Sequence, residues 1–157
     1  MSREKNGLHL TADVRKWYSS LGLKFFEDLN IQEGQVVLDF GCRVGNYTIP
    51  VAESVGIGGK VYALDVNHEA VDEAMKRAKA FSLENIIPMK TQGELEIELP
   101  NESVDVILFY DVIRSLCKDK GLQPFLILLK EFYRILKPGG ILTILFEHVS
   151  SLEFTIE

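Results

Sequence analysis

The chain has 157 residues, of which 46% are hydrophobic and 25% are charged, and this size suits one domain that buries its own core. Seventeen Lys and Arg against 23 Asp and Glu give a formal net charge of −6, which disfavours binding to a nucleic-acid backbone. Cys42 and Cys117 lack CxxC spacing and the three histidines are scattered, which excludes a disulfide framework and a zinc site.

The N-terminus is polar and no apolar core of a signal peptide follows it. No apolar run approaches the roughly 18 residues that a membrane-spanning helix needs. These two features predict a cytoplasmic protein without a membrane span.

An amphipathic stripe runs through residues 11–30, ahead of the first predicted strand. The apolar residues at helical spacing are Val14, Trp17, Leu21, Phe25 and Leu29. Because Gly22 interrupts the stripe, we expect two short helices that pack on the sheet or over its mouth. We therefore divide the chain into a helical segment, residues 1–30, and a single core domain, residues 31–157.

Five short apolar runs have the composition of strands. They lie at residues 36–40, 61–66, 86–91, 104–110 and 141–146. Most are continuously apolar, which is typical of strands that helices cover on both faces. The runs therefore predict a mostly parallel sheet.

The segments between these strands have helical periodicity. A helix after Asn67, its expected N-cap, has apolar residues at Val71, Ala74, Met75, Ala78 and Phe81. A second helix carries Phe125, Leu129, Phe132 and Leu136 and is ended by Pro138 and the glycines after it. A weaker helix is expected at 46–55, and residues 92–103 read as a loop.

The alternation of strands and helices predicts a doubly wound, Rossmann-like α/β fold. In such folds ligands bind beyond the carboxyl ends of the strands, where the winding reverses. The residues that follow each predicted strand are therefore the candidates for a functional site.

The first strand runs into a glycine-containing turn at residues 39–45 (DFGCRVG). Glycine lets the backbone turn tightly and approach a ligand closely. The spacing lacks the middle glycine of the G-x-G-x-x-G dinucleotide motif, so the turn alone indicates either a nucleotide-like ligand or only a tight connection.

The second strand ends in Asp65, about 20 residues after the glycine turn. A carboxylate at this place can accept hydrogen bonds from both hydroxyls of a ribose. Alternatively, Asp65 is an acid that stabilises the start of the next helix through the helix dipole.

Four segments together resemble the motifs of class I S-adenosylmethionine-dependent methyltransferases. They are 39–45 (DFGCRVG), 63–66 (ALDV), 103–107 (SVDVI) and 136–142 (LKPGGIL), and the resemblance covers about residues 30–146. It is strongest to the small-molecule group that includes the quinone-biosynthesis type. The resemblance implies S-adenosylmethionine as cofactor, a small-molecule methyl acceptor and the strand order 3-2-1-4-5.

The resemblance also implies roles for individual residues. Gly41, Cys42 and Gly45 would line the cofactor turn, Asp39 would lie near the cofactor ammonium, and Asp65 would bind the ribose hydroxyls. Val66 would lie against the adenine, Gly93 or Glu94 would flank it, and the backbone near Tyr110 would approach the methionine end. Independently of the family, a carboxylate such as Asp39 suits a cofactor that carries sulfonium and ammonium charges.

The chain departs from the family pattern at three places. Arg43 stands where the family has its middle glycine, and its side chain either points to solvent or grips a carboxylate. Glu94 is one position out of phase with the acid that often follows the third strand. The last two strands of the family are missing, so the apolar fifth strand would leave an open edge. We expect a second copy to cover this edge in a homodimer, or the chain to be part of a longer enzyme.

No catalytic residue is assigned from the sequence, because methyl transfer from a sulfonium mainly requires positioning. Candidates for a base are Tyr110, Asp111, Arg114, Glu147 and His148. Trp17 and Tyr18 either belong to the core or cover an aromatic acceptor. A binding module without turnover is the alternative to an enzyme, and a nicotinamide dehydrogenase is disfavoured by the missing dinucleotide motif.

Overall fold

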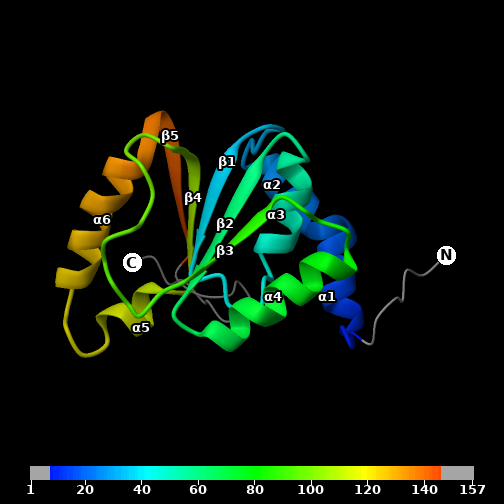
Figure 1. The fold of residues 1–157 in the computed structure, drawn as a ribbon, viewed down its shortest axis with the longest axis horizontal. Coiled ribbons are helices and arrows are strands. Elements are labelled where there is room, and N and C mark those ends of the chain that lie inside the picture. Colours follow the sequence, from blue (N-terminus) through cyan, green and yellow to red (C-terminus); the bar gives the residue numbers. More distant parts are fainter. Residues whose placement is uncertain (1–7, 146–157) are drawn as a thin grey trace, which may run out of the picture.

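A computed structural model describes residues 8–145, which form a five-stranded parallel sheet between two layers of helices (Figure 1). The strand order is β3-β2-β1-β4-β5, so the predicted doubly wound fold and the order 3-2-1-4-5 are confirmed. The strands are β1 (Val36–Phe40), β2 (Lys60–Asp65), β3 (Ile86–Lys90), β4 (Val104–Tyr110) and β5 (Leu136–Leu145).

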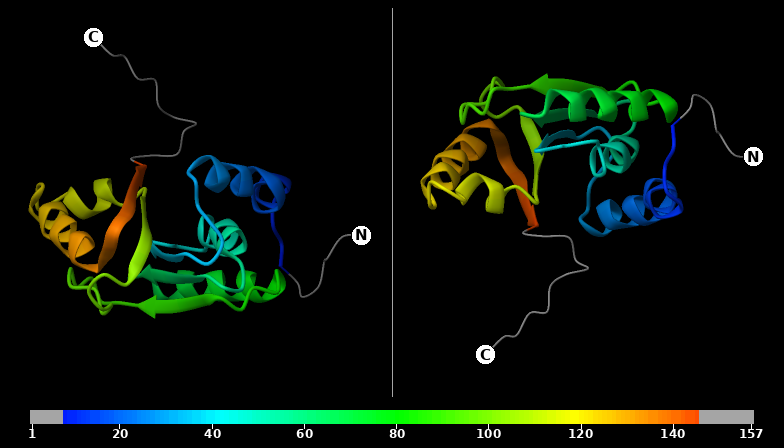
Figure 2. Two further views of the ribbon diagram at one scale, coloured as in Figure 1. Left: turned by 90° about the horizontal axis from the view of Figure 1, so that it is seen from above. Right: turned by 90° about the horizontal axis from the view of Figure 1, so that it is seen from below.

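The helices divide between the two faces of the sheet. Figures 1 and 2 show α6 on one side of the strands and the N-terminal helical segment with α3 and α4 on the other. The helices are α1 (Ala12–Lys16), the π-helical turn η1 (Trp17–Leu21), α2 (Gly22–Asp28), α3 (Thr48–Val55), α4 (His68–Ala80), α5 (Ile113–Cys117) and α6 (Gln123–Ile135). The sequence pattern did not predict the short helix α5.

The N-terminal segment contains two short α-helices, as expected, but Gly22 does not break the helical backbone between them. Gly22 has helical dihedral angles and begins α2 directly after the π-helical turn. A Cβ at this position would lie 2.8 Å from the Cβ of Pro50 on α3. Gly22 is therefore a site of close helix packing rather than a helix end.

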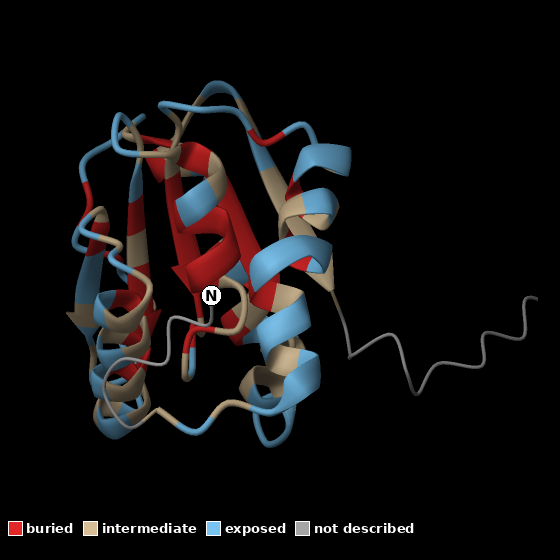
Figure 3. Ribbon diagram, turned by 90° about the vertical axis from the view of Figure 1, so that its right-hand side faces the viewer, coloured by how far each residue is buried: buried red, intermediate tan, exposed pale blue. Residues whose placement is uncertain are grey.

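Apolar side chains cover both faces of the sheet, which explains the continuously apolar strands. Within β4, Val106 and Leu108 face the cluster that includes α3 and α4, whereas Ile107 and Phe109 face the cluster under α6. Figure 3 shows the strands buried at the centre and the outward faces of the helices exposed. The sheet is thus a rigid support for the residues at its two edges.

Most predicted helix boundaries agree with the structure. The Asn67 side chain accepts a hydrogen bond from the Ala70 N–H, as expected of an N-cap. The helix α6 ends at Ile135, but β5 begins at Leu136, five residues earlier than predicted. The pairing of β5 with β4 is irregular between Leu136 and Ile141, and Gly140 allows the two strands to approach there, because a Cβ would lie 3.1 Å from the carbonyl oxygen of Asp105.

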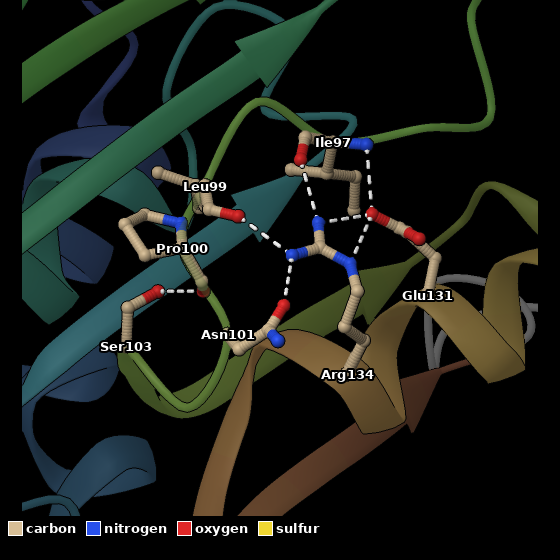
Figure 4. A network of polar contacts seen from close by, with 7 residues as sticks. All are labelled: Ile97, Leu99, Pro100, Asn101, Ser103, Glu131 and Arg134. Atoms are coloured by element: carbon tan, nitrogen blue, oxygen red, sulfur yellow. Dashed lines mark hydrogen bonds and ion pairs between the residues drawn. The ribbon is translucent and has the colours of Figure 1, made fainter.

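The loop between β3 and β4 is held on α6 by Arg134 (Figure 4). Its guanidinium donates hydrogen bonds to the carbonyl oxygens of Ile97 and Leu99, at 2.8 and 2.9 Å, and to the side chain of Asn101 at 2.8 Å. Glu131 pairs with Arg134 and also accepts from the Ile97 N–H at 3.1 Å. Arg134 and Glu131 together therefore hold this loop, which has no helix or strand structure of its own, on α6.

Asp105 of the SVDVI segment lies at the amino edge of the sheet. Its Oδ2 accepts a hydrogen bond from the Val36 N–H at 2.8 Å and from the Lys137 ammonium at 3.1 Å. Two of the four family-like segments thus meet through Asp105 and Lys137 on the edge opposite the predicted ligand site. These two residues join the starts of β1, β4 and β5.

β5 forms one end of the sheet, and it pairs only with β4 among residues 8–145. Ile141 on this strand is 42% exposed. In the same part of the chain, no helix is long and apolar enough to cross a membrane.

Candidate functional site

The turn after β1 is fixed by hydrogen bonds to β2. The N–H groups of Gly41 and Cys42 donate to the carbonyl oxygen of Leu64, at 2.8 and 2.9 Å. The next N–H, of Arg43, donates to Oδ2 of Asp65 at 2.8 Å. The turn therefore lies at the carboxyl ends of β1 and β2, at the switch point between β1 and β4.

Asp65 organises this edge and keeps capacity for a ligand. One oxygen accepts from the Arg43 N–H and the other from the Asn67 N–H, each at 2.8 Å. A carboxylate oxygen has a second lone pair, so each oxygen can accept one further hydrogen bond. A pair of neighbouring hydroxyls is a ligand that such a carboxylate can bind.

Asp39 lies one strand away and is almost fully buried, with 1% of its surface exposed. Its Oδ2 accepts a hydrogen bond from the Thr48 hydroxyl at 2.6 Å. Burial raises the pKa of Asp39 from 3.8 to about 7, and the nearby charge of Asp65 adds to the rise, while the Thr48 hydrogen bond opposes it. No positively charged side chain of residues 8–145 is among the causes of this shift, so a cationic ligand would stabilise the charged form of Asp39.

The two glycines of the turn are required by the packing of the chain itself. Both have positive φ angles, 80° at Gly41 and 90° at Gly45. A Cβ on Gly41 would lie 2.4 Å from Cγ2 of Val112, and one on Gly45 would lie 3.1 Å from the Cβ of Ala74. These glycines are therefore not by themselves an indication of a ligand.

Cys42 directs its side chain into the core rather than to the edge. It is 4% exposed and belongs to the cluster on the α3 and α4 side of the sheet. Burial also raises the pKa of its thiol. Only the backbone of Cys42 is placed to meet a ligand.

Arg43 is exposed, which favours the solvent-facing one of the two alternatives. Its φ of 49° lies in the left-handed region, which costs a residue with a Cβ about 1 kcal/mol. This backbone conformation explains why glycine suits the position.

Val66 and Gly93 lie side by side beyond β2 and β3. Val66 is 59% exposed, and a Cβ on Gly93 would lie 3.9 Å from its Cγ1. Together they present an apolar, uncrowded surface that a flat ring can cover. Glu94 is exposed and accepts from the Gln92 N–H at 2.8 Å, and hydrogen bonds from its own N–H and that of Gln92 lower its pKa.

Tyr110, at the end of β4, is almost buried and meets Tyr47 edge to face at 4.8 Å between ring centroids. Its hydroxyl accepts a hydrogen bond from the Thr143 hydroxyl at 2.7 Å. Burial raises the pKa of both tyrosines to about 12, so both are protonated at neutral pH. Neither tyrosine is suited to act as a base.

The other candidate bases divide between the described residues and the rest of the chain. Asp111 directly follows β4 at a φ of 59°, and its charge contributes to the raised pKa of Tyr47. Arg114 lies in α5, next along the chain. Glu147 and His148 lie outside the described residues.

The sequence analysis missed Tyr47 and Thr48. Both follow Gly45 within three residues, where the turn enters α3, and Tyr47 also lies within reach of the Asp39 charge. A search of the first helical turn after the glycines could have found them. Their side-chain directions depend on how α3 packs, which no sequence pattern shows.

The donor set fits a ligand with hydroxyls and positive charge. Asp65 offers two acceptor oxygens, Asp39 offers a buried negative charge, and Val66 with Gly93 offers an apolar surface. Among the described residues no group of His, Cys, Asp or Glu could hold a metal ion. A cavity of about 560 Å³ lies at the amino edge of the sheet between α3 and β3, away from these groups.

Comparison with known proteins places most of the chain in one family. Residues 37–140 match the family model described as "Methyltransferase domain". The chain is 32% identical over 117 residues to a protein of Lactobacillus johnsonii named demethylmenaquinone methyltransferase, covering 74% of this chain and 46% of that protein. It is 28% identical to the protein of the same name from Geobacillus sp., covering 88% and 62%.

The fold comparison agrees with the sequence comparison. A crystal structure of a SAM-dependent methyltransferase from Aquifex aeolicus matches with a TM-score of 0.67 and 30% identity, covering 87% of this chain and 72% of that one. The chain spans only about half the length of the curated relatives it matches.

Proposed function

Because the chain belongs to the methyltransferase domain family, we propose that it binds S-adenosylmethionine and transfers the methyl group to a small-molecule acceptor. The observation that carries this proposal is the pair of carboxylates, Asp39 and Asp65, at the carboxyl ends of neighbouring strands. When bound, S-adenosylmethionine supplies a methyl group on a positively charged sulfur. The proposed site matches both its charge and its ribose.

In this proposal the residues of the chain bind and orient. Asp65 accepts the two ribose hydroxyls through its remaining lone pairs, while its existing hydrogen bonds hold the turn. Val66 and Gly93 cover the adenine. Asp39 favours the cationic end of the cofactor through its charge, because its hydrogen-bond partner Thr48 is neutral.

The backbone of the cofactor turn contributes shape rather than charge. Gly41, Cys42 and Gly45 would pass the methionine and ribose portion with their main chain, since the Cys42 side chain is in the core. Glu94 would flank the adenine, and Tyr110 would limit the methionine end. No residue of the chain is assigned as a base, because a good leaving group and near-attack geometry supply most of what methyl transfer requires.

The acceptor is proposed from the relatives. The two curated relatives are named for demethylmenaquinone, and we propose a quinone-type small molecule for this chain as well. The negative charge of the chain supports a small molecule over a nucleic acid.

Isothermal titration calorimetry with S-adenosylhomocysteine and with the nicotinamide dinucleotides tests the proposal. We expect saturable heat with S-adenosylhomocysteine and none with NAD or NADP. Absence of binding to S-adenosylhomocysteine by a folded protein would contradict the proposed function.

The open edge of β5 supports a second proposal, which concerns assembly. Two copies of the chain pair through residues 141–145. Exposed apolar edges are normally covered in soluble proteins. Sedimentation is expected to show a dimer that Ile141→Lys dissociates, whereas Tyr133→Lys on the exposed face of α6 leaves it intact. A monomer of the unchanged chain would refute this assembly.

The cytoplasmic location of the protein and the division of the chain at residue 30 stay predictions.

A further inference from the structure

A cavity of about 360 Å³ lies between the N-terminal helical segment and the cofactor turn. Its lining comes from three parts of the fold that are far apart in sequence: α1 with its π-helical continuation and α2, the entry to α3, and the end of β5. The residues are Asp13, Val14, Trp17, Phe25, Asn46, Tyr47 and Leu145. The volume lies near the lower end of the roughly 300–1,000 Å³ that small-molecule sites occupy.

Aromatic rings form the walls of this cavity. Trp17 lies 5.7 Å from Phe25 and 5.9 Å from Tyr47, measured between ring centroids, and it is perpendicular to Tyr47. The three rings therefore give the cavity an aromatic lining against which a flat ligand can pack. The cavity is therefore suited to an apolar ring system.

The walls are held in place by hydrogen bonds to the end of the cofactor turn. The Trp17 indole N–H donates to the carbonyl oxygen of Asn46 at 2.6 Å, and the Tyr18 hydroxyl donates to that of Gly45 at 3.3 Å. Arg77 of α4 donates to the Tyr18 hydroxyl at 2.9 Å and to the Asn46 side chain at 3.3 Å. Tyr18 is thus a buried anchor, whereas Trp17 faces the cavity.

Tyr47 joins the cavity to the proposed cofactor site. Its ring lines the cavity, while the charges of Asp111, Asp39 and Arg43 all act on its hydroxyl. Tyr110 contacts the same ring from the β4 side. A molecule in the cavity would therefore lie next to the residues that we assign to the methionine end.

We infer that this cavity is the methyl-acceptor site of the chain, and that it takes a flat, uncharged aromatic ring system that packs against Trp17, Phe25 and Tyr47. The inference rests on the proposed function, and it assigns the acceptor to particular residues, which neither the family match nor the relatives' names do. It also gives the N-terminal helical segment a role in specificity.

The lining favours an uncharged ring over an organic cation, which aromatic walls can also bind. Among the described residues of the lining, Asp13 is the only one with a charged side chain, and it is exposed in the first turn of α1. Water and the helix dipole already stabilise it there. The lining within residues 8–145 therefore offers no buried counter-charge to an ammonium group.

Trp17 is the only tryptophan of the chain, so its fluorescence reports directly on the cavity. The experiment saturates the protein with S-adenosylhomocysteine and titrates it with 2-naphthol, or with phenyltrimethylammonium as the cationic probe, with equilibrium dialysis as a second readout. Val14→Phe fills the cavity with an apolar side chain, and Ile127→Phe makes the same kind of change on the exposed surface of α6.

We expect saturable quenching by 2-naphthol, weaker binding of phenyltrimethylammonium, and a loss of 2-naphthol affinity of roughly tenfold or more in Val14→Phe. Ile127→Phe should bind as the unchanged protein does, and all variants should keep their affinity for S-adenosylhomocysteine. Unchanged 2-naphthol affinity in Val14→Phe, tighter binding of the cation, or no naphthol binding beside intact S-adenosylhomocysteine binding would overturn the cavity assignment alone. Failure to bind S-adenosylhomocysteine would overturn the proposed function as well.

Discussion

Aspartate residues have different roles at the amino edge and at the carboxyl edge of the sheet. At the amino edge, Asp105 accepts from the Val36 N–H and pairs with the Lys137 ammonium, so the protein itself neutralises its charge. At the carboxyl edge, Asp39 is buried with a hydroxyl from Thr48, and the second carboxylate nearby raises its pKa further. The difference indicates that the amino edge is built for stability, whereas the carboxyl edge keeps unbalanced charge that a cationic ligand can satisfy.

The largest expected effect is on the pH dependence of stability, through Asp39. Below about pH 4 the Asp39 carboxyl is protonated in the folded protein and in the unfolded chain. Between about pH 4 and 7 the folded protein retains the proton that the unfolded chain releases. The free energy of unfolding should therefore fall as pH rises through this window, by an amount on the order of 3 kcal/mol. Asp39→Asn should remove this decline.

Urea unfolding at pH 4.5 and pH 8 measures the free energy of unfolding of the unchanged protein and of Asp39→Asn. If the unchanged protein and Asp39→Asn lose the same stability between the two pH values, the buried charge is not the cause, and the contrast between the edges fails.

The next effect is on cofactor affinity, through Asp65. Asp65→Asn leaves either the Arg43 or the Asn67 N–H without its acceptor and weakens the proposed ribose contact. We expect the affinity for S-adenosylhomocysteine to fall roughly 10- to 100-fold in calorimetry. Asp105→Asn is the matched control at the other edge and should leave this affinity unchanged, so an equal loss in both variants would contradict the assignment.

A smaller effect, on stability alone, is expected at the amino edge. Arg134→Met keeps the apolar stem but removes the hydrogen bonds to the loop carbonyls of Ile97 and Leu99. Unfolding by urea should show a loss of about 1–2 kcal/mol, with unchanged binding of S-adenosylhomocysteine. The exposed Lys130 on the same helix provides the control Lys130→Met, which should be neutral. Weakened cofactor binding in Arg134→Met would show that the two edges are coupled.

The smallest effect is expected in the cofactor turn. Arg43→Gly relieves a left-handed backbone conformation, partly offset by the greater freedom of glycine in the unfolded chain. We expect a gain of about 0.5 kcal/mol in thermal or urea unfolding, whereas Arg43→Lys should give none. A loss of stability in Arg43→Gly would mean that the arginine side chain, rather than its backbone, sets the stability of the turn.

The sequence allowed the five strands and the two long helices to be predicted, because apolar periodicity and capping residues are local signals. The strand order was implied only by the resemblance to the methyltransferase family. It could not predict that Gly22 continues a helix, because the reason lies in Pro50 on another element. The start of β5 at Leu136 was missed for a similar reason, since Gly140 permits a close approach to β4.

At the candidate site, motif spacing correctly placed Asp39 and Asp65 at one edge of the sheet. It did not show that Val112 packs on Gly41, that Cys42 turns into the core, or that Tyr47 faces a cavity. Each of these depends on side-chain direction, which only tertiary packing determines. The cofactor roles themselves stay predictions for every residue of the turn.

A crystal structure of the chain with S-adenosylhomocysteine tests the central claim most directly. The account predicts the ligand along the carboxyl edge of β1 and β2, with the ribose hydroxyls within hydrogen-bond distance of Asp65 and the adenine against Val66. A ligand in the amino-edge cavity between α3 and β3, or one that leaves Asp65 without a ligand contact, would contradict it.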